Sequence, residues 1–134
     1  MEKRCHVVIA DDHPVIRAVL RATLAMDSGI DVIGEAVDGR EAIHAVVRLA
    51  PDVVLMDLNM PVMGGLEATA EIKRRYPGVR VVIVTMHKGQ EYSDASLHAG
   101  ADGFIQKDAS FSELCTAVRS VMAGEIYGLR PAVC

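Results

Sequence analysis

The stretch VVLMDLNMPVMGG, residues 53–65, has the composition of a buried strand followed by a turn. Asp57 is the only charged residue among its apolar neighbours. Pro61 stiffens the loop that follows, and Gly64–Gly65 allow a tight turn in front of a helix. This pattern raises the question of why the most apolar strand of the chain ends in one carboxylate.

The composition is that of one folded domain. The chain has 134 residues, of which 51% are hydrophobic and 24% charged, a composition typical of neither disordered nor membrane proteins. No apolar run approaches the roughly 20 residues of a membrane span, and two aspartates interrupt the N-terminal apolar stretch, which excludes a signal peptide. The formal net charge is −4 with scattered basic residues, which gives no support for nucleic-acid binding by this chain itself. The cysteines Cys5, Cys115 and Cys134 show no CxxC spacing, and we expect free thiols in a reducing cytoplasm.

Apolar runs alternate with segments of helical period along the chain. The expected strands are 6–10, 30–36, 52–56, 79–85 and 103–106. The first expected helix starts at Pro14, and its core face consists of Val15, Ile16, Val19, Leu20 and Leu24. Asp38 is the expected N-cap of the second helix, the third covers about 65–75, and the fifth opens with the capping box Ser110–Glu113. The fourth, near 90–99, has a weak apolar face because Ser, Asp and His side chains interrupt it.

This alternation predicts an α/β fold. Five strands and five helices fit a flavodoxin-like (βα)5 doubly wound parallel sheet of order 2-1-3-4-5, in three α/β/α layers. Strands that are apolar throughout fit a sheet buried on both faces. We assign residues 1–124 to this domain and residues 125–134 to the start of a linker. In such folds ligands bind outside the carboxyl ends of the strands, so the side chains at those ends are the candidates for function.

Polar side chains stand at the expected ends of four strands. Asp11 and Asp12 follow the first strand, Asp57 follows the third, Thr85 ends the fourth and Lys107 follows the fifth. Two carboxylates 4 Å apart repel by about 4 kcal/mol at an effective dielectric near 20, so three acids in one crevice indicate a bound cation. Mg²⁺ prefers carboxylate, water and phosphate oxygens and would also neutralise a phosphoryl group. The set therefore indicates phosphoryl transfer to a carboxylate nucleophile, with Asp57 as the acceptor.

Each of these residues also has a purely structural interpretation. Thr85 by itself fits a strand, Lys107 a solvated surface and Asp12 a helix cap. We prefer the functional interpretation because all of them fall at the same edge of one sheet.

The motifs at these positions resemble those of a known family. IADDHP (9–14), MDLNMPVMGG (56–65), VIVTMH (82–87) and GADGFIQKDAS (100–110) are similar to the receiver domain of bacterial two-component response regulators. The resemblance covers nearly the whole chain. The KDAS motif, the ending AGEIY (123–127) and the HP after the acid pair are similar to the NarL/FixJ subgroup. Members of that subgroup usually carry a LuxR-type helix-turn-helix DNA-binding domain further on.

The resemblance implies a phosphoacceptor and a metal site. Asp57 would accept a phosphoryl group from a sensor histidine kinase. Asp11, Asp12 and Asp57 would bind Mg²⁺, with the backbone carbonyl of Asn59 as a further ligand. We expect a signalling protein and not an enzyme, although it would promote its own Mg²⁺-dependent phosphorylation and dephosphorylation.

The resemblance also implies how the signal spreads. Thr85 and Lys107 would contact the phosphoryl group, and Thr85 and Phe104 would form the switch. Asn59 and His87 stand where the family tunes the lifetime of the phosphoryl bond. Phe104 cannot donate the hydrogen bond that a tyrosine could, so switching there would rest on packing. Many receivers have a proline with a cis peptide bond directly after the lysine, but this chain has Asp108, and the sequence leaves that geometry open.

Phosphorylation is expected to bias a two-state surface. The fourth helix is the best candidate for the moving part, because its poor apolar face implies low local stability. A homodimer would form through the fourth helix, fifth strand and fifth helix, or through the first and fifth helices. DNA would be contacted only by a C-terminal domain outside this chain.

Three other functions are compatible with parts of this pattern. A haloacid-dehalogenase-like phosphatase needs a second acid two residues after its nucleophile, where this chain has Asn59. A flavodoxin-like electron carrier needs a hydroxyl- and glycine-rich loop after the first strand, where Asp11–Asp12 would repel a flavin phosphate. A stand-alone receiver that acts by binding another protein stays open, because no helix-turn-helix follows Glu125 in the sequence. The subgroup features favour a fragment of a longer transcription regulator.

Overall fold

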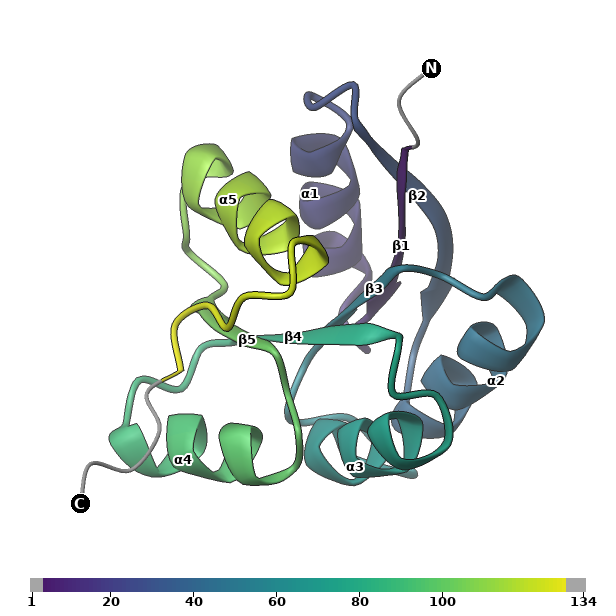
Figure 1. The fold of residues 1–134 in the computed structure, drawn as a ribbon, viewed down its shortest axis with the longest axis vertical. Coiled ribbons are helices and arrows are strands. Elements are labelled where there is room, and N and C mark those ends of the chain that lie inside the picture. Colours follow the sequence, from purple (N-terminus) through teal and green to yellow (C-terminus); the bar gives the residue numbers. More distant parts are fainter. Residues whose placement is uncertain (1–3, 130–134) are drawn as a thin grey trace.

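The computed structural model describes residues 4–129, whose strands form one parallel sheet (Figure 1). Its order is β2-β1-β3-β4-β5, as the sequence predicts. The strands are β1 (Cys5–Ala10), β2 (Ile30–Ala36), β3 (Val53–Met56), β4 (Arg80–Thr85) and β5 (Gly103–Gln106). The helices are α1 (Pro14–Leu24), α2 (Gly39–Leu49), α3 (Gly65–Arg75), α4 (Gln90–His98) and α5 (Phe111–Met122). Every strand begins within one residue of its predicted start.

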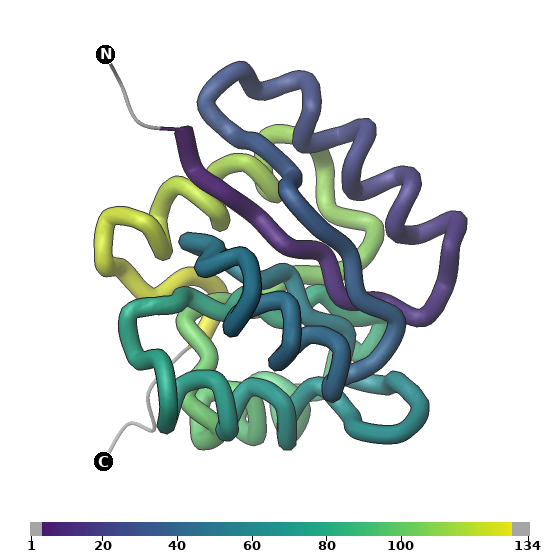
Figure 2. Tube along the Cα trace, turned by 90° about the vertical axis from the view of Figure 1, so that its right-hand side faces the viewer, coloured from purple at the N-terminus to yellow at the C-terminus, as the bar shows by residue number. Residues whose placement is uncertain are grey.

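Helices cover both faces of the sheet, with α1 and α5 on one side and α2, α3 and α4 on the other (Figure 1). The tube view shows β1 and β2 running side by side (Figure 2). Successive strand residues point to opposite faces, so Val7 packs in the cluster under α1 and α5, while Val8 packs in the cluster under α2 and α3. Two buried cores thus hold the sheet rigid, and its carboxyl edge is left to carry polar groups.

The core face of α1 is narrower than the sequence predicts. Leu20 and Leu24 are buried, and Ile16 packs against the same cluster. Val15 and Val19, which we expected in the core, are 73% and 54% exposed. The buried residues are spaced by four along the helix and form one stripe, whereas the two valines lie one position to its side. That part of the prediction is wrong, and α1 presents an apolar i, i+4 pair on the described surface.

Helix ends follow the predicted capping residues. Asp38 accepts a hydrogen bond of 2.8 Å from the backbone N–H of Glu41. Ser110 accepts one of 3.2 Å from the N–H of Glu113, while the Glu113 carboxylate meets the Ser110 hydroxyl at 3.3 Å. Half of the predicted capping box is therefore present in its usual form. In α4 the buried side chains are serines, in agreement with its weak apolar face.

The chain after α5 packs back onto the domain. Tyr127 forms a parallel bridge with Gly103 of β5, and Leu129 is 6% exposed in the α2–α3–α4 core. The rest of the expected linker, residues 130–134, lies outside the described residues. Within residues 4–129 there is no cis peptide bond, so the bond between Lys107 and Asp108 is trans. No helix in this part of the chain is long and apolar enough to cross a membrane.

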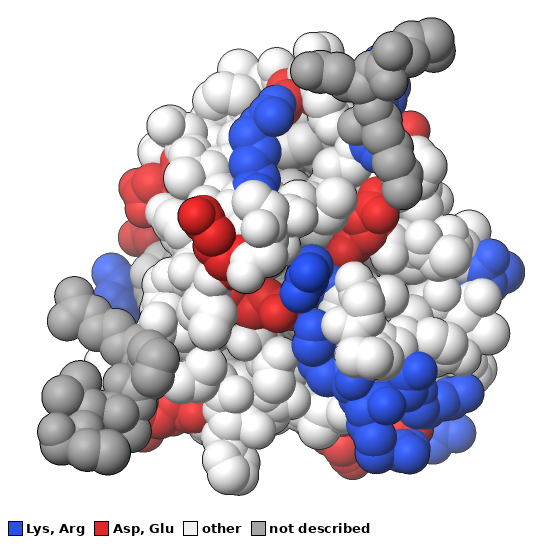
Figure 3. All heavy atoms as spheres, viewed as in Figure 1, with Lys and Arg blue, Asp and Glu red and all other residues white. Residues whose placement is uncertain are grey.

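Basic side chains are less evenly spread than the sequence suggests. The last turn of α3 carries Lys73, Arg74 and Arg75 in succession. The space-filling view shows Lys and Arg side chains gathered at this corner of the molecule (Figure 3). Arg74 is partly neutralised by Glu71 at 2.7 Å.

Candidate functional site

The candidate residues meet at the carboxyl edge of the sheet because the strand ladder continues past the strand ends. The N–H of Asp57 donates to the carbonyl of Ala10 over 2.9 Å, which places the acid after β3 beside the acids after β1. The N–H of Lys107 donates to the carbonyl of Thr85 over 2.9 Å, which aligns β5 with β4. The regular backbone therefore brings together stretches that are far apart in the sequence.

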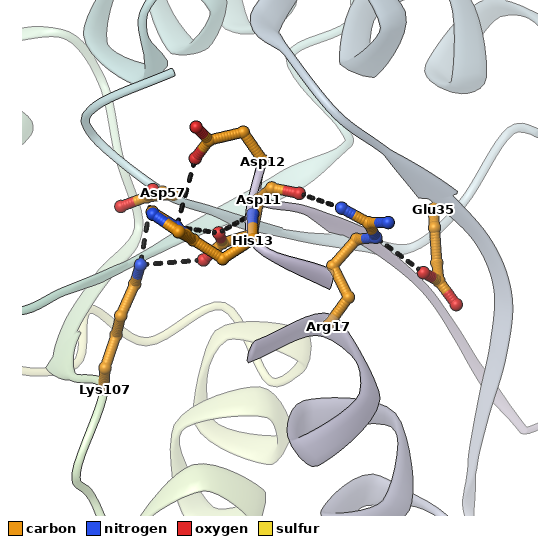
Figure 4. A network of polar contacts seen from close by, with 7 residues as sticks. All are labelled: Asp11, Asp12, His13, Arg17, Glu35, Asp57 and Lys107. Carbon is orange, nitrogen blue, oxygen red and sulfur yellow. Dashed lines mark hydrogen bonds and ion pairs between the residues drawn. The ribbon is translucent and has the colours of Figure 1, made fainter. Parts of the chain in front are cut away.

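Lys107 links two buried carboxylates (Figure 4). Its Nζ lies 2.9 Å from Oδ2 of Asp11 and 3.3 Å from Oδ2 of Asp57. All three side chains are at most 6% exposed. In so dry an environment charges interact strongly, and one ammonium faces two carboxylates.

The pKa directions reflect this imbalance. Burial raises the pKa of Asp57, the charge of Asp11 raises it further, and together they outweigh Lys107 and the N–H of Asn59. Burial opposes the charged form of Lys107, but the hydrogen bond to Asp11 and the charge of Asp57 outweigh it and raise the pKa of that ammonium. The pocket holds Lys107 charged and still has an excess of negative charge.

Asp12 and His13 complete the acidic pocket. Nδ1 of His13 lies 3.0 Å from Oδ1 of Asp11 and 3.2 Å from Oδ1 of Asp12. One ligand atom from each of Asp11, Asp12, His13 and Asp57 lies within 4.8 Å of the others. Oδ1 of Asp12 is buried, and among the described residues it has the close contact with His13 but no hydrogen bond. Three carboxylates within so small a space fit a hard divalent cation such as Mg²⁺. His13 is not among the predicted site residues, although it directly follows the acid pair.

Thr85, Asn59 and His87 lie beside this pocket. The hydroxyl of Thr85 is buried and accepts a hydrogen bond of 3.1 Å from the N–H of His87. The His87 ring contacts Nδ2 of Asn59 through Nε2 and stacks on Tyr92 of α4 with the ring centroids 4.2 Å apart. Tyr92 was not predicted, and it connects the β4–α4 loop to the helix. Phe104 is 8% exposed in the core beneath α4.

A pair of arginines and a glutamate, which were not predicted, hold the backbone of the acid pair through hydrogen bonds. Nη1 of Arg17 donates to the backbone carbonyl of Asp11 over 2.7 Å, and its Nε donates to Glu35 over 2.8 Å (Figure 4). Arg21 donates to the other carboxylate oxygen of Glu35 over 2.7 Å. Burial opposes ionisation of Glu35, but the hydrogen bonds from Arg21 and Arg17 outweigh it and lower its pKa. The signal in the sequence was the i, i+4 spacing of Arg17 and Arg21, which places both arginines on the same polar side of α1, where they can share one acidic partner.

Fold and site together define the class of flavodoxin-like (βα)5 domains with an acidic pocket at the carboxyl edge of the sheet. Comparison with known proteins identifies the family within that class. The family model of the response regulator receiver domain matches residues 7–119, and the chain belongs to this family.

Known relatives place the chain among LuxR/NarL-type response regulators. Response regulator GacA of Pseudomonas viridiflava is 40% identical over 121 residues, which cover 90% of this chain and 56% of the relative. A two-component response regulator of the LuxR family from Aurantimonas sp. has a crystal structure with a TM-score of 0.89 and 34% identity, covering 93% of this chain and 89% of that one. The signal receiver domain of a NarL response regulator from Mycobacterium tuberculosis gives a TM-score of 0.87 and 33% identity, covering 92% and 100%. The chain spans about half the length of the curated relatives it matches.

Several general properties are known for receiver domains, the family to which this chain belongs. Receiver domains are typically signalling proteins without enzymatic function, and they interact with histidine kinases. They bind Mg²⁺ at an acidic pocket, and in this chain Asp11, Asp12 and Asp57 form such a cluster. Among the similar solved structures, one contains two RcsB dimers bound to two parallel DNAs.

Proposed function

We propose that Asp57 accepts a phosphoryl group from a partner histidine kinase. The P–N bond of a phosphohistidine breaks as a P–O bond forms to one oxygen of Asp57. The observation that carries this proposal is the buried Asp11–Lys107–Asp57 cluster, in which one ammonium stands 2.9 and 3.3 Å from two carboxylates. Asp57 is thus a carboxylate kept rigid, dry and next to a fixed positive charge that can pair with an arriving phosphoryl oxygen.

The acidic cluster and the family resemblance together support a set of metal ligands. Asp11, Asp12 and Asp57 supply carboxylate oxygens, and the backbone carbonyl of Asn59 supplies the further ligand. When bound, Mg²⁺ neutralises the charge that builds up between the acids and the phosphoryl oxygens. His13, which now contacts both acids of the pair, would give up these contacts to the cation.

The switch starts at Thr85. Its hydroxyl accepts a hydrogen bond from the His87 N–H. A phosphoryl oxygen on Asp57 would accept a hydrogen bond from the same hydroxyl, and this charged acceptor would draw Thr85 toward Asp57. Rotation of Thr85 would alter the packing around Phe104. Helix α4 would then move, because its buried face consists of serines and so has few apolar contacts to hold it in place. Asn59 and His87 cover the approach to the site and set how fast water reaches the phosphoryl group.

We propose that the protein regulates transcription. Residues 1–124 form the receiver domain, residues 125–134 start a linker, and a LuxR-type DNA-binding domain follows. Phosphorylation promotes homodimerisation, through α1 and α5 or through α4, β5 and α5. The coverage of only about half of each curated relative supports a longer protein. The alternative is a stand-alone receiver that acts by binding another protein.

The proposal is tested with a small phosphodonor, Mg²⁺ and intact-mass measurement. One phosphoryl adduct is expected on the parent protein and none on Asp57→Asn. Asp12→Asn serves as a second variant that keeps Asp57 and weakens the metal site, so it should slow the reaction without moving the adduct. An adduct that survives Asp57→Asn would place the acceptor elsewhere.

A further inference from the structure

The chain beyond α5 pairs with the free edge of β5, the last strand of the sheet. The N–H of Tyr127 donates to the carbonyl of Asp102 over 2.9 Å, and the N–H of Phe104 donates to the carbonyl of Tyr127 over 2.9 Å. Both bonds follow the pattern of a parallel bridge at Gly103. An open strand edge is a general pairing surface, and here the protein's own chain covers it. We call residues 126–129 the β5 strap.

The β5 strap makes its closest contacts with one residue, Phe104. Gly128 adopts a φ of +72°, and a Cβ at this position would lie 2.1 Å from the carbonyl oxygen of Phe104. Leu129 is 6% exposed and belongs to the same buried cluster as the Phe104 ring. The strap thus contacts the backbone of Phe104 through hydrogen bonding and close approach, and it shares a core with the side chain.

We propose that the β5 strap is a regulatory contact, docked on Phe104 in the unphosphorylated protein and released when Asp57 is phosphorylated. The trigger rests on the proposed function, whereas the docking rests on the described contacts. The strap directly precedes the rest of the chain, so its release changes how the following segment is tethered to the receiver.

Packing provides the physical link between the site and the strap. Phe104 pairs in register with Ile83 of β4, two residues before Thr85. Protein cores are close-packed, so a shift of the Phe104 ring that follows movement of Thr85 removes contacts from Leu129. With its anchor loosened, the strap retains only a short edge pairing, and such pairings open readily.

A strap that merely protects the edge of β5 makes a different prediction, because it would stay docked whatever the state of Asp57. Residue-resolved amide exchange by NMR, with and without beryllofluoride and Mg²⁺, separates the two. We expect the Tyr127 and Phe104 amides to exchange roughly tenfold faster or more in the beryllofluoride complex, because exchange reports local opening. Unchanged exchange at both amides in the saturated complex would overturn the inference.

Two glycines provide a matched pair of variants. Gly128→Ala places a methyl group against the Phe104 carbonyl, whereas Gly124→Ala has a similar φ of +87° but no atom within 4 Å of the new Cβ. Both variants place alanine in the left-handed region, which costs about the same free energy in each. Only in Gly128→Ala does the new methyl group force the strap away from β5. Without beryllofluoride, Gly128→Ala should therefore show the fast exchange at Phe104 and Tyr127, while Gly124→Ala keeps slow exchange there. Equal exchange in the two variants would contradict the docking model.

Leu129→Ala keeps the experiment informative if Gly128→Ala fails to fold, because it removes the apolar anchor without a backbone clash. Binding linkage also requires the reverse effect: a variant with a released strap should bind beryllofluoride more tightly than the parent. Intact mass with a small phosphodonor distinguishes the two proposals. An adduct on Asp57 with a strap that stays docked overturns only this inference, and absence of any adduct overturns the proposed function and with it the trigger.

Discussion

Arg17 holds the backbone of Asp11 in place, with 2.7 Å between its Nη1 and the Asp11 carbonyl oxygen. Glu35 fixes the guanidinium by accepting from its Nε over 2.8 Å. The carboxylate of Asp11 points from this anchored backbone into the pocket toward Lys107. Arg17 therefore acts as a positioning residue for the proposed metal site, although its described contacts include no carboxylate of that site.

Arg17→Gln should weaken Mg²⁺ binding, because the acid pair loses its backbone anchor. A hydrogen bond from a charged donor contributes about 1.5–3 kcal/mol. If half of that is lost from binding, the dissociation constant rises roughly four- to twelvefold. Isothermal titration calorimetry with Mg²⁺ measures it directly.

Arg21→Gln is the matched control, since Arg21 also bonds Glu35 but does not contact Asp11. It should leave the Mg²⁺ dissociation constant within about twofold of the parent, which is the effect of a surface ion pair of a few tenths of a kcal/mol. Equal weakening in both variants would mean that the Glu35 cluster acts through general stability and not through Asp11.

The raised pKa of Asp57 predicts that this residue lowers the folding stability by an amount that depends on pH. In the unfolded chain this carboxyl has its ordinary pKa, 3.8, so the folded protein keeps the proton to higher pH than the unfolded one does. Folding stability therefore falls as the pH rises from about 3.8 through the raised value, and the full cost is present at neutral pH. Asp57→Asn should melt at a higher temperature than the parent at about pH 7.5, by about 4 °C for each kcal/mol removed. The gap should narrow as the pH is lowered toward 3.8.

Mg²⁺ provides the control for this pH experiment. A cation that binds only the folded parent stabilises it, so saturating Mg²⁺ should close much of the gap to Asp57→Asn. Differential scanning calorimetry at several pH values, with and without Mg²⁺, gives both comparisons. A lower melting temperature for Asp57→Asn in neutral, metal-free buffer would show that Lys107 outweighs burial.

The contact between Asn59 and His87 should set the lifetime of the phosphoryl group jointly, and not residue by residue. The two side chains are in contact, and Tyr92 of α4 stacks on the histidine. Either Asn59→Ala or His87→Ala opens the same path for water, so each should speed dephosphorylation, and the double variant should add little. Residues in direct contact show coupling energies of about 0.5–3 kcal/mol. Time-resolved intact mass of the phosphorylated protein gives the rates, and additive effects would exclude a shared barrier.

The fold could be predicted because each element is specified locally. Strands such as Val53–Met56 are continuous apolar runs, and Asp38 and Ser110 mark helix starts by chemistry that acts within three residues. The convergence of Asp11, Asp57, Thr85 and Lys107 also followed, because parallel strands that end at one edge must bring their ends together.

What the sequence did not reveal depends on contacts between distant side chains. Arg17 and Glu35 stand on different elements, and the segment containing Glu35 looked ordinary. The exposure of Val15 depends on how α1 is rotated over the sheet, which helical period alone does not settle. Tyr127 and Leu129 looked like linker residues, and only the open edge of β5 explains why they pack.

Gly65 explains why the turn after Asp57 has a second glycine. Helix α3 begins at this residue, and a Cβ there would lie 2.0 Å from the backbone oxygen of Asp57. The obstacle is backbone, so it cannot rotate away, and Gly65→Ala has to push the start of α3 from the end of β3. We expect a loss of about 1–3 kcal/mol in the free energy of unfolding by urea denaturation, as for an overpacked core. Because the displaced atoms belong to the proposed phosphoacceptor, phosphorylation by a small donor should slow as well. Gly78→Ala, whose added Cβ meets nothing within 4 Å, should stay within about 0.5 kcal/mol of the parent. If the two variants were equally stable and equally reactive, close approach of α3 to Asp57 would not be what requires glycine at this position.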